Sequence, residues 1–261
     1  MEWELGVAGL AAGVLIAMAT APVGVSGAVF LLPVQLSVFA VPNPAVTPTN
    51  LLYNVVAGPG ALLRHRRDGA LRGPLVRCMA LGALPGVILG AVIRVFALPG
   101  PDVFRLLVAA LMLPLGTWLI ARTLRPARPE IRRPEPAPRT VTGLALAVGV
   151  VGGIYGIGGG SILGPVLVGR GVSVSKVAPA ALASTFATSL VGASTYALLS
   201  LAHSGSIAPD WFLGLACGLG GLIGGYLGAC LQPRMPEIFL RLLLGTLAAA
   251  LGTLYAIYAL R

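Results

Sequence analysis

Long apolar stretches rich in Leu, Ala, Val and Gly recur along this chain of 261 residues. Each is close to the ~20 residues that a helix needs to cross a bilayer, whereas strands of a membrane β-barrel would show alternation over about ten residues. Charged residues make up 10% of the chain, compared with about 25% in a soluble domain. So few charges cannot cover a water-soluble surface, which excludes a soluble enzyme. The sequence predicts an all-α polytopic membrane protein.

The formal net charge of +10 comes mostly from basic residues in short segments between the apolar stretches. The two largest groups lie at residues 64–77 and 122–139, and neither has aromatic residues between its arginines for base stacking. We therefore interpret the charge as a determinant of membrane topology rather than a nucleic-acid site. The three cysteines, Cys78, Cys217 and Cys230, are scattered in apolar segments without a CxxC pattern. We predict no metal, no cofactor and no nucleic-acid partner.

The chain contains two copies of one pattern. A Gly-rich turn that ends in proline occurs twice, with Pro33 and Pro165 lying 132 positions apart, and later matches follow at an offset of 135. The later matches place Thr49, Asn50 and Leu51 on Ser184, Thr185 and Phe186, Asn54 on Ser189, and the pair Gly86 and Gly90 on the pair Gly221 and Gly225. We predict a first transmembrane repeat at residues 1–121, a basic Pro-rich cytoplasmic linker at 122–139, and a second transmembrane repeat at 140–261.

Each predicted repeat contains about five hydrophobic segments. Residues 5–41 are nearly all apolar, and as one helix they would be about 55 Å long, almost twice the ~30 Å hydrocarbon core. The first two segments of each repeat must therefore form a Gly/Pro-broken hairpin, for which a re-entrant path and two full crossings both remain open. The segments are 5–22, 25–41, 46–63, 74–97 and 102–121, then 140–156, 159–170, 177–201, 211–231 and 236–260.

The distribution of basic residues predicts how the repeats are oriented. An odd number of segments per repeat inverts the second copy, and cytoplasmic loops are enriched in Lys and Arg. With five segments per repeat, only Arg94, Arg105 and Arg261 of the 18 basic residues lie outside the cytoplasm. Four segments per repeat give a poorer separation. We therefore predict two inverted-topology repeats with both termini outside.

Short Gly-interrupted segments in matching positions of inverted repeats are typical of secondary transporters, whose site lies at the midplane between the halves. The helices after the two turns are predicted to begin near Ser26 and Ser161, and the N–H groups and positive dipole end of a first turn favour an anion. Close helix packing is the alternative interpretation of the glycines, and we favour it for the spaced pairs Gly86/Gly90 and Gly221/Gly225. The predicted tip residues are Gly24, Ser26, Gly27, Gly158, Gly159, Gly160 and Ser161.

Polar side chains on the neighbouring helices form two matching stripes. Asn50 and Asn54 are one helical turn apart and share a face, and their mates Thr185 and Ser189 have the same spacing. Together with Thr49, these residues are predicted to converge on the tips and bind substrate. Ser and Thr can instead bond to their own helix backbone, an alternative that explains the two asparagines less well.

Ionisable side chains are missing from the apolar segments. All eight acidic residues, as well as His65 and His203, lie at termini, in loops or at segment ends. Proton pumps and cation carriers usually place such a group inside the membrane, and Ser26 and Ser161 have no nearby base for hydrolysis. We predict no catalytic residue, no metal site and no enzyme activity.

These residues resemble the TauE/SafE family (TSUP) of sulfite and organosulfonate exporters over almost the whole chain. The resemblance rests on the two Gly-rich turns ending in Pro33 and Pro165, on the sequence Thr49 to Asn54 followed by Gly58 and a basic loop, and on the GxxxG helices. It implies a protein of the bacterial inner membrane that moves sulfur-containing anions. The first tip departs from the family pattern, because Ser26 and Ala28 replace two of three glycines. The two halves are therefore expected to contribute unequally.

The sequence thus predicts a secondary membrane transporter that exports a small sulfur-containing anion, such as sulfite or an organosulfonate, through the bacterial inner membrane. A passive anion channel and a carboxylate permease are the alternatives within transport. A ligand-free membrane scaffold or assembly protein is the alternative from another class. The expected partners are the small anion and the lipid bilayer, and the oligomeric state remains open.

Overall fold

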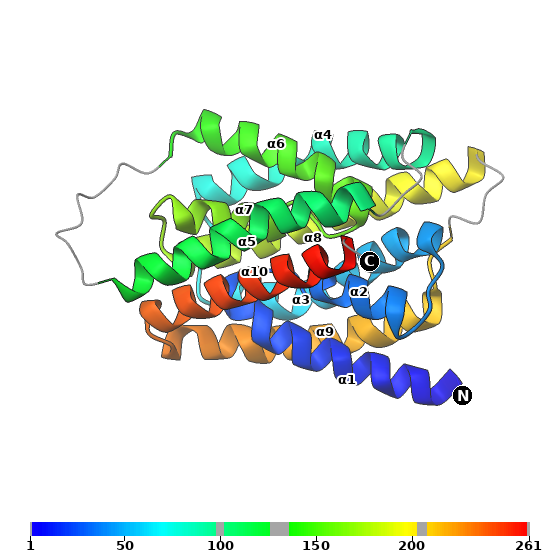
Figure 1. The fold of residues 1–261 in the computed structure, drawn as a ribbon, viewed down its shortest axis with the longest axis horizontal. Helices are drawn as coiled ribbons and strands as arrows, with labels where there is room; N and C mark the ends of the chain where they lie inside the picture. The colour runs from blue at the N-terminus through cyan, green and yellow to red at the C-terminus, as the bar shows by residue number, and fades with distance from the viewer. Residues whose placement is uncertain (1, 98–101, 126–135, 203–207, 260–261) are drawn as a thin grey trace.

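The computed structural model describes residues 2–97, 102–125, 136–202 and 208–259. Within these ranges all regular structure is helical, which confirms the predicted fold class (Figure 1). The α-helices are α1 (Glu2–Thr20), α2 (Ala28–Ser37), α3 (Asn43–Arg67), α4 (Pro74–Phe96), α5 (Asp102–Leu124), α6 (Pro138–Tyr155), α7 (Gly160–Gly169), α8 (Val174–Ala202), α9 (Trp211–Leu231) and α10 (Glu237–Ala259). Two short 3-10 helices, η1 (Ala21–Val23) and η2 (Gln232–Arg234), follow α1 and α9.

The composition of the long helices makes this a multi-pass membrane protein. Six segments of the described chain are long and apolar enough to cross a bilayer, and they correspond to α1, α4, α6, α8, α9 and α10. Large apolar side chains such as Leu81, Leu198 and Ile238 are exposed on their outer surfaces. An apolar surface of this extent suits lipid, while the helices satisfy their backbone hydrogen bonds internally.

The two broken hairpins contain helices that are too short to cross the membrane. α2 and α7 have 10 residues each, or about 15 Å, which is half of the ~30 Å hydrocarbon core. α2 returns toward the end of the molecule at which α1 begins (Figure 1). The turns lie deep in the protein, where Val23 and Ile157 are fully buried. Two full crossings per hairpin do not fit helices of this length, and the re-entrant path stays a prediction.

Glycine is required at the start of each turn by the backbone conformation. Gly24 ends η1 with φ 74°, and Gly156 ends α6 with φ 70°, both in the left-handed region where a Cβ is unfavourable. A Cβ at Gly24 would also lie 2.4 Å from the Cα of Ala178. The same local chemistry therefore reverses the chain at corresponding places in the two halves.

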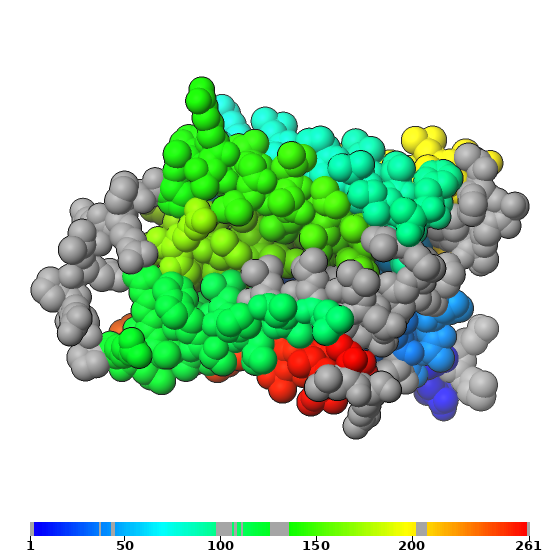
Figure 2. Space-filling view, turned by 45° about the horizontal axis from the view of Figure 1, so that its top comes forward, coloured from blue at the N-terminus to red at the C-terminus, as the bar shows by residue number. Residues whose placement is uncertain are grey.

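Helix packing repeats between the halves. α1 packs on α9 as α6 packs on α4, α3 packs on α9 as α8 packs on α4, and the pairs α3/α8 and α5/α10 join equivalent helices. The surface view shows α5 lying against α10 (Figure 2). Equivalent helices run in opposite directions in Figure 1, as α1 and α6 show. The predicted inverted repeat accounts for both observations.

The predicted domain boundaries stay a prediction, although the helix ends give them detail. α5 continues to Leu124 and α6 begins at Pro138, so both helices enter the predicted linker at 122–139. The start of α6 lies beside two other basic segments, because Arg72, Ala137 and Lys176 line one groove. The N-terminal end of α1 and the C-terminal end of α10 lie at the opposite end of the molecule (Figure 1).

The predicted packing glycines of the first half pack on α6. A Cβ at Gly86 or Gly90 would lie 2.3 or 2.1 Å from a carbonyl oxygen of α6, so both glycines permit close packing. The equivalent contacts on α9 are made by Gly220 and Gly224, each about one residue before the predicted position. A Cβ there would lie 2.0 Å from the Leu10 oxygen and 2.1 Å from the Val14 oxygen, respectively. On α9, Gly221 also permits close packing, but against α3, because its Cβ would lie 2.7 Å from the Ala57 Cβ. Adjacent glycines in α9 permit either register, and only contact with α1 distinguishes them.

Candidate functional site

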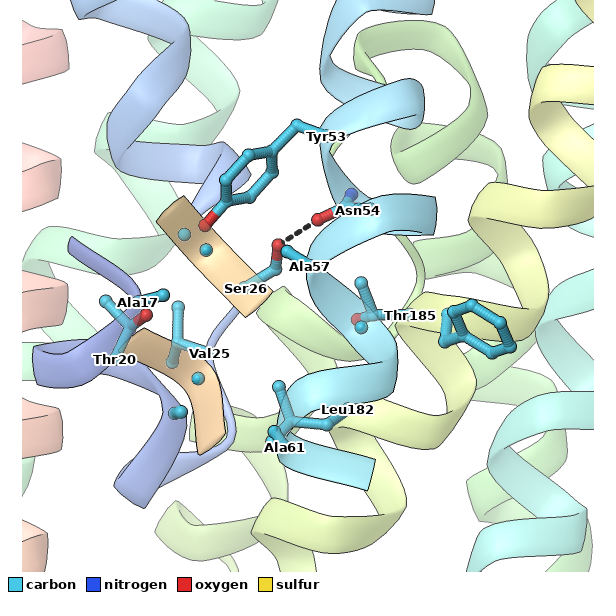
Figure 3. Close-up of a pocket in the computed structure, with 16 residues that line it drawn as sticks. Ala17, Thr20, Val25, Ser26, Tyr53, Asn54, Ala57, Ala61, Leu182 and Thr185 are labelled. Carbon is cyan, nitrogen blue, oxygen red and sulfur yellow. Dashed lines mark hydrogen bonds between the residues drawn. The ribbon is translucent and has the colours of Figure 1, made fainter. Parts of the chain in front are cut away.

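A cavity of about 40 Å³ lies beside the first hairpin tip, between α1, α3, α8 and α9 (Figure 3). Four of the predicted site residues line it, namely Ser26, Gly27, Asn54 and Thr185. Thr20 and Tyr53 add two further hydroxyl groups. The remaining wall is formed by small or apolar residues such as Ala57, Gly221 and Gly225. A volume of this size holds a few water molecules or a small ion.

Hydrogen bonds fix the first tip against α3 and the second half. The Ser26 hydroxyl donates to Asn54 Oδ1 (Figure 3) and accepts the Ala28 N–H at 3.1 Å. The Asn54 amide donates to the carbonyl oxygen of Gly156 at 3.3 Å. Ser26 therefore caps the start of α2, and Asn54 connects this cap to the turn of the other half.

The two tips touch each other at the centre of the protein. The Ser26 backbone N–H donates to the Ser161 hydroxyl at 3.2 Å, and this hydroxyl donates to the Ile157 oxygen at 2.9 Å. A second cavity, of only about 10 Å³, lies next to Ser161 and has mostly apolar walls. The predicted convergence of the tips is therefore present, but the larger polar cavity is on the side of the first tip.

The second tip is closely packed, unlike the first. The N–H groups of Gly159 and Gly160 donate to the hydroxyls of Thr188 and Thr185 at 3.0 and 3.2 Å. A Cβ at Gly160 would lie 1.8 Å from the Ala181 oxygen, and one at Gly159 would lie 2.7 Å from the Ala83 Cβ. The expectation of free N–H groups at both tips is therefore wrong for these two residues, because α8 already supplies their acceptors.

The other predicted site residues lie around the tips without lining the cavity. Asn50 donates from its amide to the Ala28 oxygen at 3.3 Å, which holds the start of α2. Thr49 donates to the Ala45 oxygen at 2.6 Å and accepts the Asp210 N–H at 2.9 Å, away from the tips. Ser189 is fully buried, and its hydroxyl has no hydrogen-bond partner. Gly24 and Gly158 shape the turns through positive φ angles.

Thr20 and Tyr53 are lining residues that the sequence prediction missed. The Thr20 side chain is 2% exposed, and its hydroxyl oxygen has no hydrogen-bond partner although it borders the cavity. Thr20 is the single polar residue between Glu4 and Ser26, and it lies two residues before Pro22. This isolated polar residue next to the predicted turn could have indicated that Thr20 lines the site. Tyr53 directly precedes Asn54, and its hydroxyl would lie 2.2 Å from a Cβ at Gly27.

The ionisable residues lie at helix ends in the part of the chain that the structure describes, but one of them is buried. Asp210 caps α9 by accepting the Leu213 N–H at 2.9 Å, and Glu237 accepts the Val174 N–H at 2.8 Å. His65 lies in the last turn of α3, is 2% exposed, and has an unpartnered Nε2. His65 therefore lies at a segment end as predicted, but its side chain is buried there, whereas His203 lies outside the described residues.

A multi-pass helical bundle in which two Gly-rich hairpins meet beside a cavity with several hydroxyl groups in its wall is the architecture of a membrane transporter. The chain belongs to the sulfite exporter TauE/SafE family, whose sequence pattern matches residues 9–255. It is also similar to the Arabidopsis thaliana protein called "Sulfite exporter TauE/SafE family protein 1", with 33% identity over 81 residues. This alignment covers 31% of the chain and 17% of the plant protein. No solved structure matches the chain.

Proposed function

We propose that this protein is a secondary transporter that exports small sulfur-containing anions, such as sulfite or organosulfonates, across the bacterial inner membrane. Membership of the sulfite exporter TauE/SafE family supports the class of substrate. The single observation that carries the site is the cavity at the first tip, with the unpartnered Thr20 hydroxyl at its wall. A buried hydroxyl without a partner is costly, and a bound anion would supply the missing acceptor.

The electrostatics of the turn favour an anion in this cavity. α2 begins at the first tip, so the positive end of its dipole is near the cavity. The C-terminal, negative end of the α1 dipole also lies beside the cavity, but the carbonyls of Thr20 in α1 and of Ala21 and Pro22 in η1 are hydrogen-bonded within the protein. Val25 N–H donates to the Thr20 oxygen, Gly24 N–H donates to the Ala21 oxygen, and the Gln232 amide donates to the Pro22 oxygen at 2.7 Å.

The proposed roles of the predicted residues follow from their contacts. Ser26, Gly27, Asn54 and Thr185 would surround the substrate together with Thr20 and Tyr53. The remaining predicted residues would shape the tips and hold them together, namely Gly24, Thr49, Asn50, Gly158, Gly159, Gly160, Ser161 and Ser189. Movement of one half against the other about the contact between Ser26 and Ser161 would expose the cavity alternately to the two sides.

Ligand binding by purified protein tests the proposal. Thermal unfolding is measured with sulfite, sulfate, thiosulfate, sulfoacetate, taurine and simple carboxylates, and a ligand at 100 times its Kd stabilises by about 2.7 kcal/mol. The Thr20→Val variant should lose about half or more of this stabilisation at the same ligand concentration. Thr117→Val is the matched control, because Thr117 is exposed and bonds only to its own helix. Equal stabilisation of both variants, or no stabilisation by any anion, contradicts the proposed site.

Flux measurements in proteoliposomes distinguish the transporter from the alternatives. A secondary transporter should show saturable uptake and counterflow of labelled sulfite against unlabelled sulfite inside the vesicle. A passive channel would give flux without counterflow, a carboxylate permease would prefer carboxylates, and a scaffold would give no flux. Each of these three results contradicts the proposed function.

A further inference from the structure

The wall of the first-tip cavity carries no formal charge. None of the described residues that line it is Asp, Glu, Lys, Arg or His. Three hydroxyls remain able to donate to a ligand: that of Thr20, which has no partner, that of Tyr53, and that of Thr185, which accepts the Gly160 N–H and keeps its own proton. Ser26 already uses its hydroxyl proton within the protein, and Asn54 uses one of its two amide protons.

The charged and titratable groups of the surrounding elements lie outside the lining of the cavity, apart from Tyr53. The turn 21–27 has none, and the Tyr and Cys side chains on the lining helices ordinarily keep their protons at neutral pH. The charged or titratable groups on these elements are Glu2 and Glu4 on α1, Tyr53 with Arg64, His65, Arg66 and Arg67 on α3, Lys176 and Tyr196 on α8, and Cys217, Tyr226 and Cys230 on α9.

A neutral cavity in a low-dielectric interior discriminates strongly by ligand charge. The Born cost of moving an ion out of water grows with the square of its charge, so a dianion costs about four times as much as a monoanion of the same size. Opposing this cost are three hydroxyl donors and the partial positive charge at the start of α2, about half of an elementary charge. These groups can balance one negative charge but not two.

We propose that the cavity selects a small oxyanion with a single negative charge, so that sulfite binds as hydrogen sulfite. This inference rests on the proposed function and specifies the ionic form of its substrate. The volume of about 40 Å³ also favours a small oxyanion over one with an organic chain. Sulfite takes up one proton to become hydrogen sulfite before binding and releases that proton after transport. The substrate itself therefore carries the proton, and no side chain has to titrate.

Isothermal titration of purified protein with three probes tests this inference. Sulfite is titrated at several pH values on both sides of its second ionisation. Chlorate has the pyramidal shape of sulfite but a single charge at every pH, and sulfate is a dianion throughout this range. The apparent Kd for total sulfite should rise toward tenfold per pH unit above its ionisation, because the monoanion falls tenfold per unit. Chlorate should bind with a constant Kd, and sulfate at least a hundredfold more weakly than chlorate.

Two variants separate titration of the ligand from titration of the protein. His65→Gln and Tyr53→Phe should retain the pH profile of sulfite binding, even if the Kd itself changes. Loss of the pH dependence in either variant would overturn the inference, as would binding of sulfate as tight as that of chlorate. If none of the probes binds in a manner that depends on Thr20, the proposed function fails and the inference fails with it. If anions bind through Thr20 but dianions are preferred, only the inference fails.

Discussion

The two hairpin tips have the same backbone design and different surroundings. Both tips follow a left-handed glycine, Gly24 or Gly156, and both begin a helix of 10 residues. The first tip adjoins the polar cavity, whereas Thr185 and Thr188 close the second tip by binding its N–H groups. Duplication has therefore preserved the turn, while the residues behind it determine whether space remains for a ligand.

The difference can be traced to the helices that pack beside the tips, namely α9 beside the first tip and α4 beside the second. The packing contacts relate Gly86 and Gly90 of α4 to Gly220 and Gly224 of α9. In the same register, the cavity-lining Gly221 and Gly225 correspond to Val87 and Ala91, which are both fully buried. A Cβ at Gly225 would make only ordinary contacts, the nearest at 3.6 Å, so this glycine leaves space where the second half has the Ala91 side chain. Gly221 leaves no such space, because its Cβ would lie 2.7 Å from the Ala57 Cβ. The sequence predicted that the two halves contribute unequally because of their tip residues alone. Helix α9, which packs beside the first tip, also contributes to the difference between the halves.

The largest expected effect concerns the packing of the second tip. Gly160→Ala should prevent stable folding, because its Cβ would lie 1.8 Å from the Ala181 carbonyl oxygen and the backbone would have to move. The cost should exceed the ~1–3 kcal/mol that is typical of overpacking. Gel filtration of the detergent extract and thermal unfolding measure it. Gly164→Ala on the same helix is the control, since its Cβ would make an ordinary contact at 3.7 Å. Equal stability of the two variants would contradict the close packing of this tip.

Removal of one hydroxyl at each tip should have opposite consequences. Thr20→Val should weaken anion binding about tenfold to a hundredfold, as expected for loss of a hydrogen bond worth about 1.5–3 kcal/mol to a charged ligand. Its stability should not decrease, because the Thr20 hydroxyl has no protein partner. Thr188→Val leaves the Gly159 N–H without its acceptor and should cost about 1–3 kcal/mol of stability while binding is retained. Titration calorimetry and thermal unfolding of both variants report the two quantities, and the reverse pattern would assign the ligand to the second tip.

Two adjacent glycines of α9 should separate cavity filling from helix packing. Gly225→Ala places a Cβ at 3.6 Å from Ala61 N, an ordinary contact, so the protein should fold and bind its anion about fivefold to tenfold more weakly. Gly224→Ala places a Cβ at 2.1 Å from the Val14 oxygen and should lower the melting temperature instead. Measurements of anion binding and melting temperature on the two variants show which of the two glycines borders the cavity and which packs against α1. Unchanged binding by Gly225→Ala would mean that the ligand does not use this wall.

Labelling of single cysteines should show which side of the membrane each end of the helical bundle faces, without affecting function. In a protein whose three cysteines are replaced by Ala, Arg72→Cys should react only from the cytoplasmic side and Ala208→Cys only from outside. Both positions are exposed, in the connections before α4 and before α9. A membrane-impermeant maleimide applied to intact cells and to inverted vesicles gives the result. Reaction of both positions from the same side would exclude the inverted arrangement.

Local features of the sequence were sufficient to predict the helices, the turns and the class of protein. Helix positions follow from apolar stretches of about bilayer length, and the turns follow from Gly and Pro, whose backbone preferences act within a few residues. The meeting of the tips, and four of the cavity-lining residues, also followed from the repeated pattern. Ser26, Gly27, Asn54 and Thr185 stand in or next to the repeated motifs, so the duplication itself identified them.

Only the tertiary structure determined which tip adjoins a cavity and which polar groups are free to bind a ligand. Thr20 meets Thr185 across the cavity, and the wall behind them is formed by Gly221 and Gly225 on α9. Thr185, Gly221 and Gly225 are each separated by more than a hundred positions from Thr20, and no local rule relates them to it. The adjacent glycines of α9 also fit two registers equally well, until contact with the carbonyl oxygens of α1 selects one. Apolar periodicity and turn chemistry are local properties, whereas the space left between packed helices depends on every side chain that borders it.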